Sequence, residues 1–448
     1  MNIIQIYDRL PIFLQNAAVS FEGYRIQKTR YNVTFERVFQ EFMNRNDWSY
    51  EQKCEYRDLQ LQKMVKHCYE TVPYYKKTFD KYGIDYRDIK YLDDLQRLPI
   101  ITKQTVKENY IDFFSTAFDR KELISQHTSG TSGSGFTFYQ NKEANAAVWA
   151  HVWRGNYNIG LERGTWCGYF GGRSIVPKSQ NKPPYYRINK PGKQIMFSAF
   201  HMRPDVLQEY FEVLNYYQPQ WIQAFPSSLL PLVSYMEEKN LKLNYIPKVI
   251  TLSSENVAQF NVEKIYRVLG TYPMQNYAQS EAVATFRQTL DRRMFVVEDF
   301  SAVELVPEGK DNLCRIIGTT LSNYAMPFLR YDMKDLVTYR QVKEGREILS
   351  LDGREEDDIK LKNGGTLRRL DFIFKDQGNI VEAQIVQKSL ELLEFHIVKG
   401  SNYTKADENK LNEDIQEYLA GNIAYRIIYV EKIEKTKSGK MKFIVSEI

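Results

Sequence analysis

The order of hydrophobic and polar positions predicts a largely helical segment over residues 1–95. Between residues 58 and 69, apolar side chains recur at helical spacing. Val72-Pro73 ends this predicted helix, because proline lacks an amide donor and restricts the residue before it. A second, short helix is predicted over Asp93–Leu98 and ends at Pro99.

Between about residue 120 and residue 350, the pattern changes to short strands that alternate with helices. The predicted strands include Trp221–Phe225, Lys248–Leu252 and Cys314–Ile317, and a predicted helix covers Asp205–Tyr217. This alternation is typical of a layered α/β body.

The last part of the chain predicts a small α+β unit of ordinary domain size, which follows a charged, glycine-bearing segment at 353–364. The lysine-rich stretch 432–442 is, taken alone, a solvated basic tail. The expected elements are a helix at Ala383–Leu393, a strand at Leu393–Val398, a helix at Asp407–Ala420, and strands at Tyr425–Val430 and Met441–Val445.

The composition indicates a globular chain of two to four domains and disfavours several protein classes. Its 448 residues are 43% hydrophobic, and the net charge of +5 is too small to indicate nucleic-acid binding. No apolar run approaches the ~18 residues of a membrane span, and no signal peptide is recognisable. The four cysteines and five histidines lack metal-binding spacings, which suits a cytoplasmic location.

Thr128–Gly135 consists only of Thr, Ser and Gly and follows a β-capable run at 122–126. Glycines let the backbone approach a ligand closely, and amides and hydroxyls can donate to an anion. The segment therefore predicts a phosphate-binding loop, with a flexible linker as the alternative. It is not a Walker A loop, because no Gly-Lys-Ser/Thr follows it.

Three further features are weak when each is taken alone. In Tyr277–Glu281 a ring precedes a carboxylate that could hold Mg²⁺ beside phosphates, but a surface turn is the simpler interpretation. In Arg330–Asp335 a carboxylate at a strand end could accept two ribose hydroxyls, or form an ordinary salt bridge. Gly353-Arg354 with the following acidic residues could be a hinge, and Ser438-Gly439-Lys440 could deliver a mobile cation.

Together, these motifs resemble in order and spacing the adenylate-forming superfamily of acyl-CoA synthetases, luciferases and nonribosomal adenylation domains. Lys66–Lys103 and the segment MPFLRYDMKD resemble the phenylacetate–CoA ligase branch. The opening stretch YDRLPIFLQNAAVSFEGYRIQKTRY is similar to CapK-type members found among capsular and exopolysaccharide assembly proteins. The likeness covers almost the whole chain.

The resemblance implies the α/β adenylate-forming enzyme fold, with a large layered α/β N-terminal domain and a small mobile α+β C-terminal domain. Residues 1–95 would be a helical region packed on the large domain, and 96–352 the main AMP-binding body. Residues 353–364 would be the hinge, and 365–448 the small domain that carries the catalytic lysine.

The resemblance also implies ATP and Mg²⁺ at the site. Tyr277 would pack on the adenine, Glu281 would bind Mg²⁺, Asp335 would accept the ribose hydroxyls, and Lys440 would bridge the acid and the α-phosphate. The segment Ala224–Ser228 would line part of the acid pocket. The other expected nucleotide-binding and hinge residues are Thr128, Ser129, Gly130, Thr131, Ser132, Gly133, Ser253, Ser254, Glu255, Ser280, Arg354 and Asp357.

Some positions depart from the family pattern, but none removes a charge that the chemistry needs. Phe136 stands where a basic residue often follows the phosphate loop, Ala278 where Gly is common, and Lys334 where Gly is usual. The hinge has one acidic residue more than usual, so its pivot could be Glu356, Asp357 or Asp358.

The implied activity is that of an ATP-dependent ligase. A carboxylate would attack the α-phosphorus and release pyrophosphate, while cations and backbone amides stabilise the transition state without a histidine base. A small-molecule carboxylate would be the donor, and the acceptor, supplied in trans, would be CoA, an amino sugar or glycan, or a carrier. The alternative is a non-catalytic nucleotide-binding assembly protein of a polysaccharide locus, and a phosphotransferase is weaker still because kinase motifs are absent.

For two features, the sequence leaves alternative interpretations open. Aromatic residues at 185–186, 216–217 and 221 could line an aryl or sugar pocket, although core packing is the stronger interpretation. Arg25, Lys28 and Arg30 flank apolar residues, so peripheral membrane contact through residues 1–30 is a second candidate beside helical packing within the protein.

Overall fold

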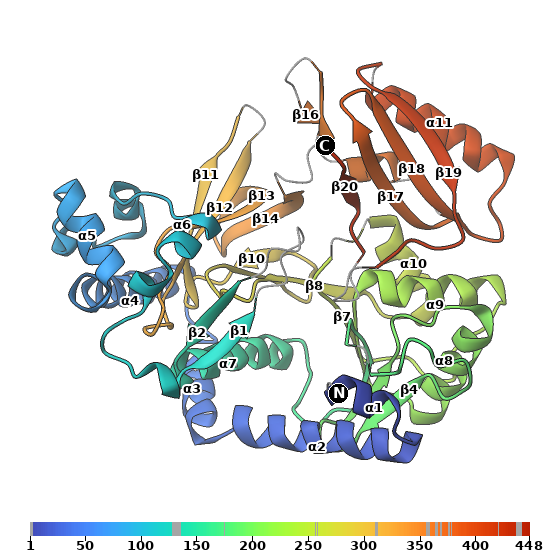
Figure 1. Cartoon of the computed structure of the whole chain (residues 1–448), viewed down its shortest axis with the longest axis horizontal. Helices are drawn as coiled ribbons and strands as arrows, with labels where there is room; N and C mark the ends of the chain where they lie inside the picture. The colour runs from blue at the N-terminus through green and yellow to red at the C-terminus, as the bar shows by residue number, and fades with distance from the viewer. Residues whose placement is uncertain are drawn as a thin grey trace. The chain divides into compact units, whose positions relative to one another are not determined.

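The computed structural model divides the chain into two compact units. Unit 1 comprises residues 1–25, 161–275 and 356–448, and unit 2 comprises 26–160 and 276–355. Helix α2 (Ile12–Arg30) and strand β8 (Pro273–Ala278) each run from one unit into the other (Figure 1). The residues described are 3–127, 136–173, 175–255, 257, 259–309, 312–354, 359–362, 366–367, 370–374, 377, 379–419, 421–435 and 441–448.

Unit 1 contains a mainly parallel sheet in the order β8-β7-β6-β3-β5-β4, in which only the pairing of β4 with β5 is antiparallel. All four residues of β7 are buried, which is typical of a parallel strand covered on both faces. The remaining strands are β3 (Cys167–Phe170), β4 (Tyr186–Asn189), β5 (Gln194–Phe197), β6 (Trp221–Ala224) and β7 (Val249–Leu252), and the helices are α1 (Ile3–Asp8), α8 (Pro204–Tyr217), α9 (Pro226–Glu238) and α10 (Gln259–Leu269).

The C-terminal part of unit 1 forms a second, four-stranded sheet in the order β19-β18-β17-β20. Helix α11 packs on it through Leu411 and Ile415, which are fully buried. Its elements are β17 (Ile380–Ser389), β18 (Leu392–Lys399), α11 (Lys405–Leu419), β19 (Ala424–Tyr429) and β20 (Ile444–Ser446), and they follow β15 (Ile359–Lys360), β16 (Thr366–Leu367) and the 3₁₀ helix Leu370–Phe374.

The predicted helix over Ala383–Leu393 is wrong. These residues form strand β17, a turn and the start of β18, which pair as an antiparallel hairpin. Ala383, Ile385, Val386 and Gln387 are buried, and the buried Gln387 side chain bonds the backbone of Lys360. Three consecutive buried residues, Ile385, Val386 and Gln387, break the strict period of two that indicates a strand, and pairing with β18 and β20 overrode helix propensity.

Unit 2 contains the antiparallel sheet β11-β12-β13-β14-β10-β9-β8 and the separate hairpin β1-β2. The strands are β1 (Ile124–His127), β2 (Thr137–Gln140), β9 (Thr285–Gln288), β10 (Met294–Val296), β11 (Ser301–Pro307), β12 (Leu313–Thr320), β13 (Tyr331–Val342) and β14 (Gly345–Arg354). The helices are α3 (Val33–Asn44), α4 (Tyr50–Thr71), α5 (Pro73–Tyr82), α6 (Lys103–Glu108) and α7 (Lys142–Asn158), with short 3₁₀ turns at Tyr86–Asp88, Leu92–Arg97, Tyr110–Phe113 and Arg120–Glu122.

The other predicted elements are confirmed with shifted ends. Helix α4 begins at a capping box, in which Ser49 and Gln52 bond each other's backbone amides, and it ends at Thr71. Pro73 stops α4 as expected and also opens α5, where its missing amide donor is not needed. The helical N-terminal region, the strands at 221, 249 and 313, the helices α8 and α11, and the strands β18, β19 and β20 all lie where the pattern predicts them.

Candidate functional site

In unit 2, the fold joins two residues of the predicted nucleotide site. Tyr277 lies near the end of β8 and Asp335 lies in β13, and the tyrosine hydroxyl donates a 2.6 Å hydrogen bond to Asp335 Oδ2. The Tyr277 ring stacks on Phe286 of β9, with centroids 4.8 Å apart and planes 19° apart. One tyrosine therefore presents a supported aromatic face beside a carboxylate.

Glu281 lies in the turn that follows β8, four residues after Tyr277. Its Oε1 accepts a 3.4 Å hydrogen bond from the hydroxyl of Tyr331, the first residue of β13. Tyr331 is buried and Glu281 is partly buried, whereas Ser280 in the same turn is exposed. Each of the two carboxylates therefore contacts a tyrosine. Tyr277 of β8 contacts Asp335, and Tyr331 of β13 contacts Glu281.

The prediction that Asp335 ends a strand is wrong, because β13 continues to Val342. The chain nevertheless bends before Asp335, since Lys334 has a φ of 58°, in the left-handed region that favours glycine. Arg354 is the register partner of Asp335 on β14. The predicted hinge arginine therefore lies in a strand opposite the predicted ribose ligand.

The described residues can hold Mg²⁺ only if water and substrate phosphates supply its remaining ligands. Among the residues that the structure describes, no group of three or more His, Cys, Asp or Glu side chains could hold a metal ion. Mg²⁺ commonly keeps several waters and binds through one or two carboxylates together with substrate phosphates. A single carboxylate, Glu281, fits that mode.

Several predicted site residues fall outside the described part of the chain: Thr128, Ser129, Gly130, Thr131, Ser132, Gly133, Asp357 and Lys440. The two strands that flank the Thr/Ser/Gly segment are described. They are β1 and β2, which pair antiparallel with His127 opposite Thr137. The β-capable run before the segment is thus confirmed as a strand.

In unit 1, the predicted nucleotide-binding residues Ser253, Ser254 and Glu255 directly follow β7. The Glu255 carboxylate accepts hydrogen bonds from the backbone amide and the hydroxyl of Ser227, both at 2.9 Å. Ser227 is in the first turn of α9, whose own N-cap residue makes no side-chain bond, so Glu255 caps this helix from a distant loop.

Glu255 also binds the C-terminal segment, because its Oε1 accepts a 2.9 Å hydrogen bond from the amide of Met441. Lys435 lies on the other side of residues 436–440, and its Nζ donates to the carbonyls of Ser227 at 2.8 Å and Ala199 at 3.2 Å. Lys435 is therefore packed against the protein and not, as the composition of the tail indicates, solvated.

Burial changes the proton affinities of this cluster. It raises the pKa of Glu255, an effect opposed by the hydrogen bonds from Ser227 and Met441 and by the charge of Lys435. It also raises the pKa of Glu382, which accepts the amide of Ile433 at 3.1 Å. Burial lowers the pKa of Lys435, and the charges of Glu382 and Glu255 oppose that change.

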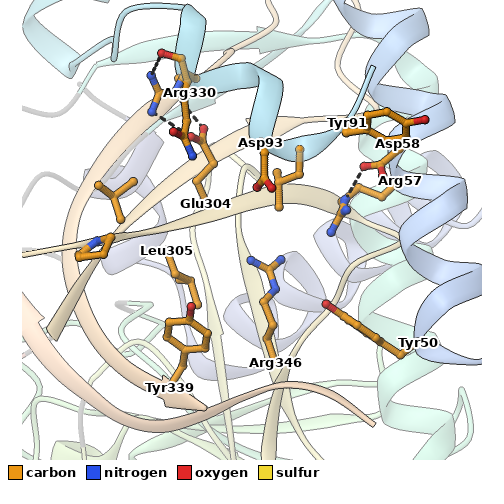
Figure 2. Close-up of a pocket in the computed structure, with 14 residues that line it drawn as sticks. Tyr50, Arg57, Asp58, Tyr91, Asp93, Glu304, Leu305, Arg330, Tyr339 and Arg346 are labelled. Carbon is orange, nitrogen blue, oxygen red and sulfur yellow. Dashed lines mark hydrogen bonds and ion pairs between the residues drawn. The ribbon is translucent and has the colours of Figure 1, made fainter. Parts of the chain in front are cut away.

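A separate cavity of about 710 Å³ lies in unit 2 (Figure 2). Its lining includes Arg57, Arg330 and Arg346 but none of the predicted site residues. Arg330 binds both oxygens of Glu304, at 2.9 and 2.8 Å, and donates to the carbonyl of Leu98 at 2.5 Å. The arginine charges are already balanced by carboxylates, so this cavity does not offer a phosphate site.

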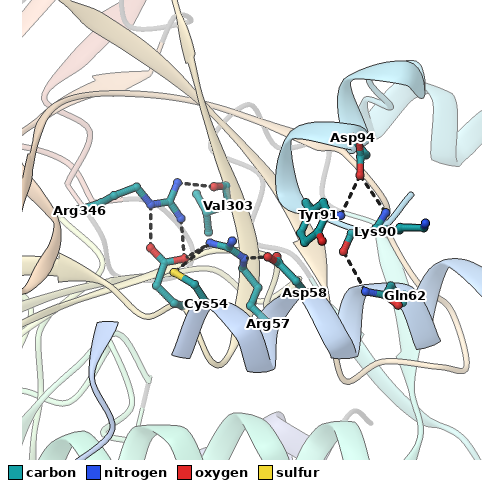
Figure 3. A network of polar contacts seen from close by, with 10 residues as sticks. Cys54, Arg57, Asp58, Gln62, Lys90, Tyr91, Asp94, Val303 and Arg346 are labelled. Atoms are coloured by element: carbon teal, nitrogen blue, oxygen red, sulfur yellow. Dashed lines mark hydrogen bonds and ion pairs between the residues drawn. The ribbon is translucent and has the colours of Figure 1, made fainter. Parts of the chain in front are cut away.

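The other two arginines of the cavity share one carboxylate (Figure 3). Glu298 accepts from Arg57 Nη1 at 2.7 Å and from Arg346 Nε and Nη2, both at 2.7 Å. The next residue, Asp299, is held in the same way by Arg45 at 3.0 Å and by Arg154 at 2.6 and 2.8 Å. Two adjacent buried acids thus fasten helices α4 and α7 and the C-cap of α3 to the segment between β10 and β11.

The aromatic segments proposed as pocket walls mostly serve other roles. Tyr185 is 1% exposed and belongs to the core of unit 1, and Trp221 donates from Nε1 to Thr251 at 2.9 Å. Tyr216 is 80% exposed on α8. Core packing is therefore the role of Tyr185 and Trp221.

Comparison with known proteins finds similarity along almost the whole chain. Residues 362–447 match the family model of the CapK C-terminal domain. The chain is 24% identical to Protein CapK of Staphylococcus aureus over 458 aligned residues, which cover 99% of each chain. It is 25% identical to the phenylacetate-coenzyme A ligase of Aromatoleum evansii over 341 aligned residues, which cover 68% of this chain and 71% of that one.

The chain is thus similar along almost its whole length to Protein CapK, and along 68% of it to a phenylacetate-coenzyme A ligase. The predicted resemblance to these proteins is thereby confirmed. The adenylate-forming fold is confirmed by the crystal structure of 2-hydroxyisobutyryl-CoA ligase in the postadenylation state in complex with 2-HIB-AMP. That structure matches with a TM-score of 0.70 at 16% identity, over 90% of this chain and 92% of the other.

No helix within the described ranges is long and apolar enough to cross a membrane. The roles assigned to individual site residues, and the domain boundaries at 95, 352 and 364, stay predictions.

Proposed function

We propose that the chain activates a carboxylic acid with ATP. An oxygen of the carboxylate attacks the α-phosphorus, the bond between the α-phosphorus and its bridging oxygen to the β-phosphate breaks, and pyrophosphate leaves. The product is a mixed anhydride of the acid and AMP. Because carboxylic acids are already ionised near neutral pH, the step needs no general base.

The hydrogen bond between Tyr277 and Asp335 is the observation that carries the proposal. It joins the residue proposed for the adenine to the residue proposed for the ribose, which are adjacent groups of one nucleoside. Glu281, in the turn after the same strand β8, supplies a carboxylate where Mg²⁺ would meet the phosphates.

The remaining roles follow from the family resemblance. Thr128, Ser129, Gly130, Thr131, Ser132 and Gly133 would hold the β- and γ-phosphates through amides and hydroxyls. Ser253 and Ser254 would flank the base, Arg354 would reach ribose or phosphate, Asp357 would serve as hinge, and Lys440 would neutralise charge between the acid and the α-phosphate. Bound Mg²⁺ would neutralise the phosphate oxygens.

In the second half-reaction, the acyl group passes from AMP to an acceptor supplied in trans. Attack by a thiol of CoA, or by an amine or hydroxyl of a sugar or carrier, displaces AMP and gives a thioester, amide or ester. Similarity over 99% of the chain to Protein CapK supports a role in cell-surface polysaccharide biosynthesis. The phenylacetate-coenzyme A ligase relatives support CoA as acceptor.

The test is acid-dependent pyrophosphate release with hydroxylamine trapping, over aryl, fatty, amino and uronic acids. We expect release with one class, formation of AMP, and loss of release in Lys440→Ala with ATP binding retained. Removing a cation aimed at the transition state should lower the rate about 10²–10³-fold. Near-normal release by Lys440→Ala would contradict the role of Lys440.

The second candidate is a nucleotide-binding assembly protein without turnover. ATP binding that depends on Asp335, together with no pyrophosphate release for any acid, would favour it. Formation of ADP in place of AMP would instead indicate phosphoryl transfer.

A further inference from the structure

The cavity of about 710 Å³ in unit 2 has a buried floor and an exposed rim (Figure 2). Its volume lies within the range of about 300–1,000 Å³ that small-molecule sites occupy. The rim consists of three exposed lining residues, Tyr91, Asp93 and Gln96, all from one short segment. The floor consists of four charged side chains that are only 6–8% exposed: Arg57, Glu304, Arg330 and Arg346.

The rim is held in place near both ends of the 3₁₀ turn Leu92–Arg97. Near its start, Asp94 accepts two backbone amides, both at 2.9 Å (Figure 3). Near its end, Arg330 of the floor donates to the carbonyl of Gln96 at 3.3 Å. The floor and the rim are thus joined, so a ligand would meet both with little loss of conformational entropy.

Four carboxylates face the three arginines of the floor. Three of them, Asp58, Glu298 and Glu304, bond to these arginines. The fourth, Asp93, makes no hydrogen bond or ion pair among the described residues, and its carboxylate points into the cavity (Figure 2). Burial raises the pKa of Glu304, the bonds and charge of Arg330 lower it, and the charge of Asp93 raises it again. One negative charge therefore stays unbalanced in the cavity.

This charge balance favours a cation over an anion, and the lining favours an organic cation over a metal ion. A metal ion would find only Asp93, because the other carboxylates bond to arginines and no group of three metal ligands occurs among the described residues. Tyr50, Tyr91 and Tyr339 line the cavity with aromatic rings, whose faces attract ammonium groups. The side-chain amide of Gln96 can bond to hydroxyl groups.

We propose that this cavity binds a small organic cation, in which a primary ammonium group on a hydroxylated ring pairs with Asp93. The tyrosine rings contact the body of the ligand, and Gln96 bonds to its hydroxyl groups. The site goes beyond the proposed function, because none of the residues predicted to hold ATP, Mg²⁺ or the acid lines this cavity. Its occupation therefore does not depend on acid activation.

The first experiment compares glucosamine, glucose and glucuronate, which share a hydroxylated ring and are cationic, neutral and anionic. Ligand-observed NMR titration with the full chain gives the three affinities at pH 6, well below the pKa of aliphatic amino groups. Glucosamine should bind about tenfold or more tightly than glucose, because it adds a charge-assisted hydrogen bond, and glucuronate should bind more weakly than glucose. Equal affinities for glucosamine and glucose, or no binding of glucosamine, would overturn the proposal.

The second experiment locates the bound amine with Asp93→Asn, which removes the charge of an exposed side chain and keeps its shape. This variant should bind glucosamine no more tightly than glucose and should change the affinity for glucose less than about twofold. The control is Asp88→Asn, an exposed aspartate outside the cavity that pairs with Arg97 at 3.4 Å, and it should keep the preference for glucosamine. A preference that survives in Asp93→Asn would place the amine elsewhere and overturn the site.

Discussion

The hydroxyl of Tyr277 donates a 2.6 Å hydrogen bond to the carboxylate of Asp335, although 58 residues separate them in the chain. The bond orients the carboxylate and fixes the plane of the ring, which also rests on Phe286. A nucleoside bound there would meet both groups already in place, so less conformational entropy would be lost on binding.

The first prediction concerns ATP affinity. Asp335→Ala should weaken ATP binding about tenfold or more, because the ribose hydroxyls would lose a charged acceptor. Tyr277→Phe should weaken it less, since the ring remains. Isothermal titration calorimetry measures both, and Tyr339→Phe on the same strand β13 is the matched control. An unchanged affinity in Asp335→Ala would remove Asp335 from the nucleotide site.

The second prediction concerns Mg²⁺. Glu281→Gln should lower the rate of pyrophosphate release about 10²–10³-fold and raise the Mg²⁺ concentration needed for half-maximal rate, because an amide is a weaker ligand than a carboxylate. Steady-state rates over a Mg²⁺ titration measure it, with the exposed Glu417→Gln of α11 as control. A lower rate with an unchanged Mg²⁺ dependence would argue against a metal-binding role.

The third prediction concerns the backbone before Asp335. Lys334 has a φ of 58°, so Lys334→Gly should relieve strain and raise the free energy of unfolding by about 1 kcal/mol. Thr338→Gly, at a position of β13 without positive φ, should lower it by about 1 kcal/mol. Urea denaturation compares the two, and a loss of stability in both variants would contradict the strain at Lys334.

The fourth prediction concerns acid stability. Burial would raise the pKa of Asp299, but the guanidinium groups of Arg154 and Arg45 outweigh it and lower the pKa to about 2. In the unfolded chain this carboxyl titrates near its ordinary value of about 4. Its contribution of about 2 kcal/mol is therefore complete above pH ~4 and is lost as the pH falls through about 2.

Asp299→Asn should accordingly flatten the dependence of the free energy of unfolding on pH between about 4 and 2. It should also lower stability near neutral pH by about 3 kcal/mol, because Arg45 and Arg154 lose their buried counter-charge. Chemical denaturation at several pH values measures both effects. Parallel curves for the variant and the wild type would contradict the assigned pKa.

The sequence was sufficient to predict those site residues that lie in motifs of recognisable spacing. Tyr277 and Glu281 lie four apart in one motif, and Asp335 follows a recognisable segment, so their roles could be proposed without a fold. The helix proposed over Ala383–Leu393 failed, because its pattern of buried positions depends on pairing with β18 and β20.

The contacts of Lys435 could not be predicted for a similar reason. The lysine-rich composition of residues 432–442 indicates exposure, whereas the partners of Lys435 are the carbonyls of residues 208 and 236 positions earlier. Glu255 was predicted only as a nucleotide-binding residue. Its side chain caps α9 and binds Met441, which no local pattern reveals.

The paired acids Glu298 and Asp299 have a consequence for synthesis on the ribosome. Arg57 and Arg45 lie 241 and 254 residues before their partners. At roughly 5–20 residues per second, the N-terminal helices would emerge some 12–50 s before the acids that neutralise them. During that interval Arg45 and Arg57 lack these two carboxylates, and helix α4 cannot yet pack on strand β11. Chaperone dependence in the cell should therefore be concentrated in nascent chains that end before residue 298.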